Sequence, residues 1–279
     1  MKSDSKMLMP REQAVALGRD TVKILDAGRY RAPSGQWVDL SASLARAVEG
    51  TVSYPPDVNV PLVSTSRHST TITMENATTL EVGRRLSKAT GVLALNFASA
   101  TTPGGGFLSG ARAQEESIAR SSGLYRCLAR NPMYSFHREL GDPAYTDYVI
   151  YSPDVPVFRT DDGVLLAEPW VLSIVTCPAV NASGLARQAP GRLPTIRSIM
   201  SARTRKVLSV ACSHGHSHIV LGAWGCGAFG ISGELMAEVF QEQLFGNFAG
   251  VFDTVVFAIT DWSPEQRFLG PFRQRFRKS

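Results

Sequence analysis

The chain has 279 residues, of which 44% are hydrophobic and 19% are charged. This length and apolar content are sufficient for a buried core, and they exclude general disorder. The formal net charge of +5 suits an anionic ligand without identifying one.

Two further absences narrow the class of protein. The sequence has no run of about 18 uninterrupted apolar residues, and its polar start lacks the apolar centre of a secretory signal, so we expect no membrane span and a cytoplasmic protein. No Cys-x-x-Cys pair occurs, which disfavours a disulfide framework or a structural zinc site and favours a reducing compartment. The four cysteines are Cys127, Cys177, Cys212 and Cys226.

The predicted elements begin with an N-terminal helical part. Residues 11–25 and 40–48 have apolar side chains near helical spacing, and residues 54–57 form a Pro-rich break. We therefore expect a helical extension over residues 1–58, packed on a core of residues 59–279 as one structural unit.

Strands and helices alternate through the rest of the chain. The predicted strands cover 69–74, 92–97, 148–151, 170–176, 218–224 and 254–260. The predicted helices cover 78–89, 114–130, 197–213 and 233–244, with Thr78 or Thr79 as a cap of the first. This order predicts an α/β sandwich with a largely parallel sheet, in which ligands bind beyond the carboxyl ends of the strands.

The first segment that carries chemistry follows the strand at 92–97. Three glycines after a proline allow the backbone to approach a ligand closely, and their N–H groups can bind an anion. Two adjacent carboxylates then open a helix, whose positive end favours their ionised form. These residues are Gly104, Gly105 and Gly106, followed by Gln114, Glu115 and Glu116.

A second glycine-rich segment lies between the strand 218–224 and the helix 233–244. Its Gly225-x-Gly227-x-x-Gly230 pattern matches the dinucleotide fingerprint formally. The acidic residue that should end the next strand is missing, which disfavours a dinucleotide site. A diphosphate cradle that closes over a ligand held by the first loop is the simpler interpretation.

Together the two segments resemble the microbial-type poly(ADP-ribose) glycohydrolases, a family with a macrodomain fold. That family carries GGG, six to eight residues, and then QEE; here seven residues separate Gly106 from Gln114. The flanking NFASA, PGGGF, ARSSGLY and HGH…LGAWGCGAFG are similar too, and Ile231-Ser232 departs from the expected Asn. The resemblance implies a three-layer α/β/α sandwich with a mixed, largely parallel sheet and an N-terminal helical extension.

The resemblance also implies an activity: hydrolysis of the ribose–ribose O-glycosidic bonds of poly(ADP-ribose), with release of ADP-ribose. Glu116 would be the catalytic glutamate and Glu115 would position ribose hydroxyls. The first loop would lie against the distal ribose and diphosphate, the second would hold the diphosphate, and Phe229 would stack near the adenine. The implied binding residues are Gly104, Gly105, Gly106, Gln114, Gly225, Cys226, Gly227, Ala228, Phe229 and Gly230, with Asn96 and Ser99 aligned loosely.

The chemistry of the carboxylates is compatible with this role. Glycoside cleavage needs a proton for the leaving oxygen and stabilises a cationic sugar. Two adjacent residues on a helix point about 100° apart, so Glu115 and Glu116 do not flank one bond as acid and nucleophile. The hypothesis is that Glu116 acts first as acid and then as base, while the substrate diphosphate stabilises the cation.

Metal and thiol chemistry are disfavoured. The run Cys212-x-His214-x-His216-x-His218 suggests ligands, but the pattern places a helix end at Gly215, so the histidines would straddle a turn. No motif puts a base beside Cys226, which favours a buried packing residue. We expect no metal and no cofactor.

The main rival function is a non-catalytic macrodomain that binds ADP-ribose or poly(ADP-ribose), because fold alone does not decide between binding and turnover. The paired glutamates favour the enzyme; a nucleotide-dependent oxidoreductase is weaker still. The resemblance implies poly-ADP-ribosylated proteins as partners and a place in the DNA damage response. We expect a monomer with neither a direct DNA requirement nor a membrane partner.

Overall fold

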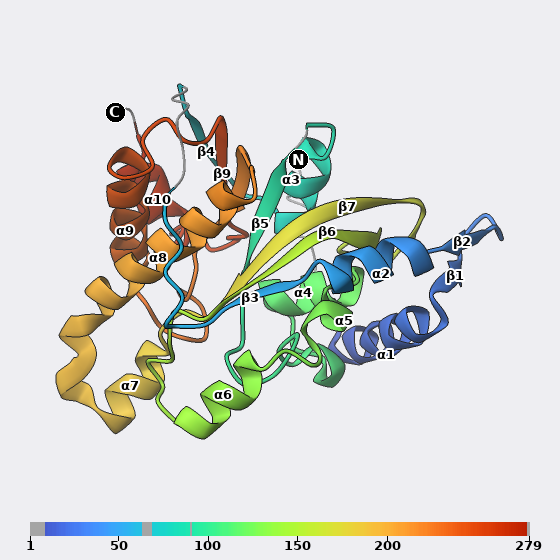
Figure 1. The fold of residues 1–279 in the computed structure, drawn as a ribbon, viewed down its shortest axis with the longest axis horizontal. Helices are drawn as coiled ribbons and strands as arrows, with labels where there is room; N and C mark the ends of the chain where they lie inside the picture. The colour runs from blue at the N-terminus through green and yellow to red at the C-terminus, as the bar shows by residue number, and fades with distance from the viewer. Residues whose placement is uncertain (1–8, 63–68, 90, 278–279) are drawn as a thin grey trace.

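The computed structural model describes residues 9–62, 69–89 and 91–277. The described chain forms a central sheet with helices on both faces (Figure 1). None of its helices is both long enough and apolar enough to cross a bilayer.

The main sheet has seven strands in the order β3-β6-β7-β5-β8-β9-β4. Their bounds are β3 Val52–Tyr54, β4 Thr71–Glu75, β5 Val92–Phe97, β6 Val149–Arg159, β7 Leu165–Cys177, β8 His218–Leu221 and β9 Thr254–Ala258. The pairs from β7 through β5, β8 and β9 to β4 are parallel, and β6 pairs antiparallel with both β3 and β7. This confirms the mixed, largely parallel sheet.

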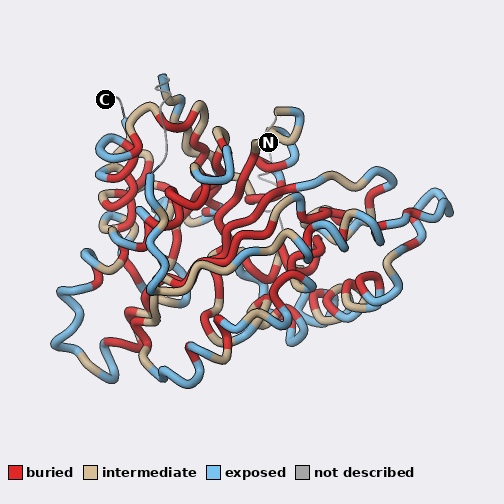
Figure 2. The backbone as a smooth tube through the Cα atoms, viewed as in Figure 1, coloured by how far each residue is buried: buried red, intermediate tan, exposed pale blue. Residues whose placement is uncertain are grey.

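Successive residues of the central strands face opposite helical layers. Leu93 and Leu95 of β5 join a core with α8 (Ile196–Ser213), α9 (Gly233–Phe245) and α10 (Leu269–Arg275), whereas Val92 and Ala94 join a separate core on the other face. That second face is covered by α2 (Ser41–Glu49), α3 (Thr79–Leu86), α4 (Gln114–Ser121) and α5 (Leu124–Leu128). Figure 2 shows that the central strands of the sheet, which lie between the two helical layers, are buried along most of their length. The three-layer prediction is confirmed.

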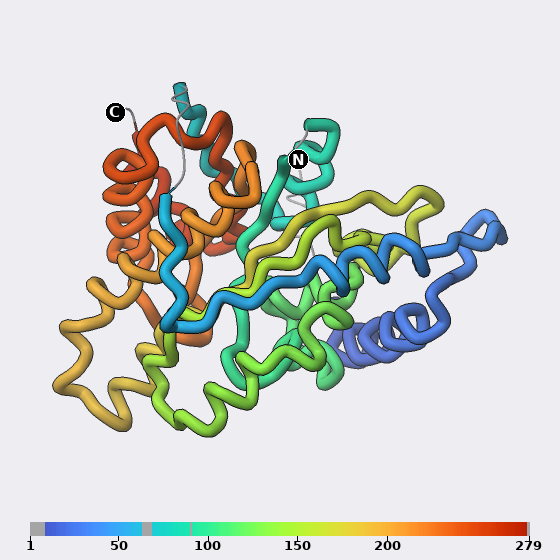
Figure 3. The backbone as a smooth tube through the Cα atoms, in the orientation of Figure 1, coloured from blue at the N-terminus to red at the C-terminus, as the bar shows by residue number. Residues whose placement is uncertain are grey.

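The N-terminal part is helical but also contributes strands that the sequence analysis does not predict. After α1 (Arg11–Ala27), a short hairpin forms from β1 (Arg29–Arg31) and β2 (Trp37–Asp39). The edge strand β3 then pairs with β6 in the main sheet. Figure 3 shows this blue segment running beside the β6–β7 hairpin, so it forms part of the same sandwich.

The predicted helix over 114–130 is wrong as a single element. It breaks into α4 and α5, because Ser122 has extended backbone angles and forms a β-bridge with Val157. The following Gly123 donates its N–H to the carbonyl of Pro156 at 2.8 Å. Backbone hydrogen bonds to β6 therefore replace those of a continuous helix.

Other elements differ mainly in length. Strands β6 and β7 have 11 and 13 residues, longer than predicted. Helices α6 (Met133–Leu140) and α7 (Ala182–Gln188) and the turns η1 (Phe107–Ser109) and η2 (Pro190–Thr195) were not predicted. Thr78 caps α3 with Glu81 in a reciprocal capping box, which confirms the predicted helix start.

Candidate active site

Three loops converge where the parallel strands β5, β7 and β8 end. The residue after β5, Ala98, donates its N–H to the carbonyl of Cys177 at the end of β7. The indole of Trp224, beyond β8, donates to the same carbonyl at 3.2 Å. Both glycine-rich loops therefore leave one edge of the sheet, as the strand order predicts.

Gln114 fixes the start of α4 to β5. Its Oε1 accepts from the backbone N–H of Phe97 at 2.9 Å, and its Nε2 donates to the carbonyl of Leu95 at 2.7 Å. Nε2 also donates to the hydroxyl of Thr79. These bonds hold the two glutamates that follow at the carboxyl end of a central strand.

Glu115 is buried, with 3% of its surface exposed. Its Oε2 accepts from the backbone N–H of Ser99 at 2.6 Å, and its Oε1 lies 3.4 Å from Nδ2 of Asn96. Burial, reinforced by the neighbouring Glu116 charge, raises the pKa of Glu115 to about 8 against these hydrogen bonds, which lower it. Its carboxyl group is therefore largely protonated at neutral pH.

Glu116 is 8% exposed, and only one of its two carboxylate oxygens is hydrogen-bonded to the described part of the protein. Its Oε1 accepts from the backbone N–H of Gly106 at 2.9 Å. Its Oε2 is buried and has no hydrogen-bond partner within residues 9–62, 69–89 and 91–277. A buried polar atom of this kind is costly unless a ligand satisfies it, so this oxygen indicates a site for one.

The first glycine loop is shaped around the two carboxylates. Gly105 has φ +58°, and a Cβ there would collide with Oε1 of Glu116 and lie 2.9 Å from Oε2 of Glu115. A Cβ on Gly104, with φ +69°, would press on the ring of Phe107 at 3.1 Å. The loop conformation and the closeness of the acids therefore both require glycine.

A cavity of about 560 Å³ opens beside this loop. Glu116, Gly105 and Gly106 form part of its wall, and Tyr125 of α5 forms another part. The sequence analysis did not single out Tyr125. The Ser-Ser-Gly run before it could have indicated that α4 ends there and that Tyr125 belongs to a separate helix.

Asn96 and Ser99, predicted as substrate contacts, both contact Glu115. Asn96 is fully buried, and its Nδ2 also lies 3.3 Å from the Thr176 hydroxyl. Its Oδ1 has no partner among the described residues. Ser99 lines the 560 Å³ cavity. Their direct contact with substrate stays a prediction.

The second glycine loop has free space in front of its central glycine, whereas carboxylates occupy that space in the first loop. A Cβ on Gly225 would lie 2.7 Å from the Ile231 side chain, and one on Gly230 would lie 2.5 Å from the Ser183 hydroxyl. Within the described part of the chain, a Cβ on Gly227 would meet nothing within 4 Å. Gly227 and Ala228 are exposed. Packing therefore fixes the ends of the loop and leaves its centre to face a ligand.

The other two predicted residues of this loop differ in character. Phe229 is half-buried, with its ring 6.1 Å from that of Tyr145, and it packs against the core that contains α8 and α9, so its contact with substrate stays a prediction. Cys226 is buried, and burial raises the pKa of its thiol to about 12. Burial thus disfavours the thiolate form that a nucleophile requires, which supports the packing interpretation.

A second cavity, of about 440 Å³, links the loop to the start of α4. Gly227 and Gln114 both line it. Aromatic side chains also line it, and these were not predicted from sequence: Phe97, Trp262 and Phe268. Apolar and aromatic walls with a few polar groups are typical of small-molecule sites.

Two histidines of the 212–218 run, His214 and His216, contact tyrosine side chains. His214 stacks on Tyr151 with ring centroids 3.6 Å apart, and its Nε2 lies 2.8 Å from the Tyr54 hydroxyl. Nε2 of His216 lies 2.8 Å from the Tyr151 hydroxyl. Among the residues that the structure describes, no group of three or more His, Cys, Asp or Glu is arranged to hold a metal ion.

Known proteins are similar to this chain in sequence and in fold. The family model for the catalytic domain of microbial-type poly(ADP-ribose) glycohydrolase (PARG) matches residues 18–160. The crystal structure of PARG from Thermomonospora curvata is 45% identical, covers 95% of this chain and 100% of its own, and has a TM-score of 0.90. Its complex with the inhibitor ADP-HPD gives 46% identity, the same coverage and a TM-score of 0.89.

A more distant structure extends the likeness. PARG from Deinococcus radiodurans in complex with ADP-ribose is 42% identical, with a TM-score of 0.79, and the match covers 83% of this chain and 96% of that one. A search among curated proteins found no match.

Fold and site thus define a glycohydrolase built on a macrodomain-like sandwich. The chain belongs to the microbial-type poly(ADP-ribose) glycohydrolase family. The main functional prediction is confirmed over its non-catalytic rival.

Proposed function

We propose that Glu116 cleaves the ribose–ribose O-glycosidic bond of poly(ADP-ribose), acting first as general acid and then as general base. The observation that carries this assignment is its Oε2, buried and without a partner among the described residues, at a cavity bordered by the glycine loop. The N–H of Gly106 fixes the other oxygen, so the free oxygen has a defined direction.

The reaction then balances as a hydrolysis. Glu116 enters this step in its protonated form and donates its proton to the leaving 2′-oxygen while the bond from that oxygen to C1″ of the terminal ribose breaks. The ribose becomes cation-like, and the nearby diphosphate offsets its charge. Glu116, now ionised, takes a proton from water as the water oxygen bonds to C1″, which yields ADP-ribose and a shortened polymer. Water is the only co-substrate, so no cofactor is required.

Glu115 supports this step without transferring the proton. Because burial raises its pKa to about 8, Glu115 adds little negative charge beside Glu116 at neutral pH. A protonated carboxyl can also donate a hydrogen bond to a ribose oxygen. This is the positioning role expected for Glu115.

The remainder of ADP-ribose fits the second cavity. The exposed backbone around Gly227 is open to a diphosphate, and the aromatic wall formed by Phe97, Trp262 and Phe268 suits a nucleoside. Phe229, which is only half-buried, keeps its proposed contact near the adenine.

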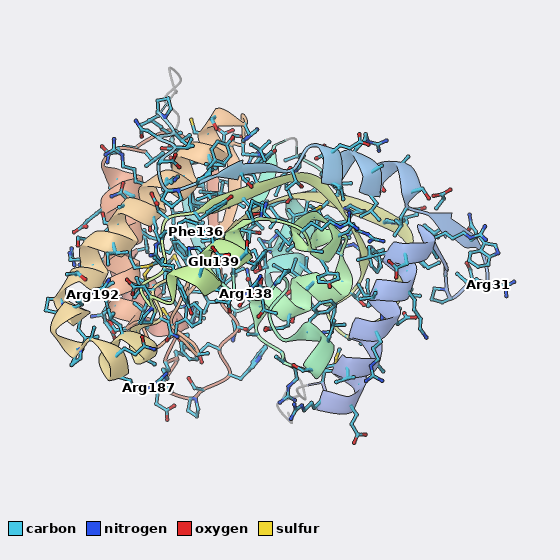
Figure 4. All side chains as sticks on the ribbon, turned by 60° about the horizontal axis from the view of Figure 1, so that its bottom comes forward. Arg31, Phe136, Arg138, Glu139, Arg187 and Arg192 are labelled. Carbon is cyan, nitrogen blue, oxygen red and sulfur yellow. The ribbon has the colours of Figure 1, made fainter. Side chains whose placement is uncertain are left out.

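Product analysis tests the assignment. Purified protein is incubated with poly(ADP-ribose) on an automodified acceptor, beside Glu116→Gln and the control Glu139→Gln, and free ADP-ribose is quantified. Glu139 is exposed on α6, so its change matches the charge lost without touching the site (Figure 4). We expect release by the wild type and the control only. Turnover by Glu116→Gln at the wild-type rate would refute the acid–base role.

The wider setting is part of the proposal. We place the protein in the cytoplasm as a monomer acting on poly-ADP-ribosylated proteins in the DNA damage response, with no direct need for DNA or a membrane. Residues 1–58 and 59–279 would act as one structural unit, which the pairing of β3 with β6 supports.

A further inference from the structure

The wall of the 560 Å³ cavity extends beyond the residues that hydrolysis of a small glycoside would need. Beyond Glu116 and the glycine loop, its wall continues to Tyr125, Leu108 and Ser109. Glu116 protonates the leaving oxygen, so whatever that oxygen is attached to must lie on the Glu116 side of the terminal ribose. In poly(ADP-ribose) the attached group is the adenosine ribose of the penultimate unit.

Tyr125 reaches this cavity only because of the helix break. In a continuous helix, nine residues at about 100° each would turn Tyr125 to the face opposite Glu116. The extended Ser122 and the backbone bond from Gly123 to β6 redirect α5, and both side chains then line one cavity. The break therefore brings a phenol and the proposed acid to the wall of one cavity.

The Tyr125 side chain is held in place but keeps its hydroxyl group free. Its ring packs on the buried Phe107, with centroids 4.8 Å apart. Over the described ranges the hydroxyl makes no hydrogen bond to the protein. A half-buried phenol fixed by packing and lacking a partner is suited to bind a hydroxyl of a ligand.

Two arginines donate hydrogen bonds to the backbone at or next to the wall of the same cavity. Arg138 of α6 donates to the carbonyl of Thr101 at 2.6 Å, next to the cavity residue Thr102, and is labelled in Figure 4. On the other side, Nε of Arg11 donates to the carbonyl of Ser109 at 3.1 Å. Neither guanidinium takes part in the salt bridges between described residues. Their charge favours a leaving group that carries diphosphates.

We propose that this cavity is a subsite for the leaving group, which holds the penultimate ribose of poly(ADP-ribose) through a hydrogen bond from Tyr125. Leu108, which is 42% exposed at the rim, packs against the same unit. Tyr125 transfers no proton; it is a specificity-determining residue that favours a sugar over other leaving groups. The inference rests on the proposed function, because Glu116 defines which side the leaving group occupies.

The test compares two substrates that differ only in the leaving group. One is poly(ADP-ribose), and the other is ADP-ribose that carries 4-nitrophenol at C1″. For Tyr125→Phe we expect kcat/KM to fall about tenfold on the polymer, the equivalent of one lost hydrogen bond, and to stay unchanged on the nitrophenyl compound. Tyr148→Phe, at a tyrosine that lines none of the described cavities, is the matched control.

A second variant keeps the proposal falsifiable if Tyr125 is needed for folding. Leu108 is exposed, so Leu108→Asp should leave the melting temperature unchanged while placing a negative charge where the polymer leaves. We expect a raised KM for the polymer alone. An equal loss on both substrates, or no loss on either, for both variants would overturn the subsite. Failure of the wild type to cleave the polymer would instead refute the proposed function.

Discussion

The two glycine-rich loops leave the same edge of the sheet but are built for different tasks. The first is pressed against carboxylates, so that Gly105 has no room for a Cβ and Gly106 binds Glu116. The second is packed only at Gly225 and Gly230, and its centre at Gly227 faces open space. Where protein atoms occupy the space in front of a glycine, the glycine serves to place a reacting group. Where that space is empty, it is available to a bound ligand.

The largest loss is expected from Gly105→Ala in the first loop. The added Cβ would displace Oε1 of Glu116, and a misplacement of about 1 Å can cost about 100-fold in rate. We expect kcat on poly(ADP-ribose) to fall by at least that factor. Gly141→Ala is the control. Like Gly105, Gly141 has a positive φ (+64°), but a Cβ there would meet nothing within 4 Å among the described residues. Similar losses in both variants would show that strain alone, not the carboxylate contact, is responsible.

Gly227→Ala should act on binding. Because an added Cβ would meet nothing within 4 Å among the described residues, stability should not change, and any effect must come from the ligand. We expect ADP-ribose affinity, measured by calorimetry, to weaken about fivefold, with little change in kcat. Gly191→Ala, also open but on η2, serves as the control. Unaltered affinity would contradict the proposal that this loop binds the diphosphate.

Glu115→Gln should change the pH dependence of stability. The pKa of Glu115 rises from its ordinary 4.5 to about 8 on folding, so the folded state binds the proton more tightly than the unfolded state. Stability therefore falls as pH rises between those values, and this loss is absent below 4.5.

The measurement for this prediction is the melting temperature of both proteins across that window. Glu115→Gln should melt a few degrees above the wild type beyond pH 8 and show no such advantage near pH 4.5. The exposed Glu139→Gln should leave the profile unaltered. A constant offset at every pH would instead indicate a change in packing.

Cys226→Ala should have the smallest effect on activity. Its thiol remains protonated because burial raises its pKa to about 12, so no step depends on it. We expect turnover within about twofold of the wild type, with a small loss of thermal stability from the vacated volume. Loss of turnover at unchanged stability would reopen the question of thiol chemistry.

Local sequence patterns predict the parts of the fold whose cause is local. The apolar run 92–97 matches β5 to the residue, and the Thr78–Glu81 box starts α3 where expected. Strand β3 was missed because it has three residues before a Pro-rich break, and only its pairing with β6 defines it. The break at Ser122 likewise depends on Val157, which lies 35 residues further along the chain.

The site shows the same division. Motif and spacing identified the carboxylates and both loops. Glycine runs and adjacent glutamates are recognisable in the sequence because backbone geometry or chemistry requires those residue types at those positions. Tyr125 could not be placed, because a continuous helix turns it away from Glu116. The aromatic wall formed by Trp262 and Phe268 comes from a segment beyond β9 that contacts the site only in the folded chain.

The most direct test separates binding from chemistry at Glu116. Calorimetry of ADP-ribose binding to Glu116→Gln is set beside its single-turnover rate on poly(ADP-ribose). The account predicts a dissociation constant close to that of the wild type and a rate lower by about 100-fold or more. Affinity and rate reduced by the same factor, or a rate that is retained, would contradict it.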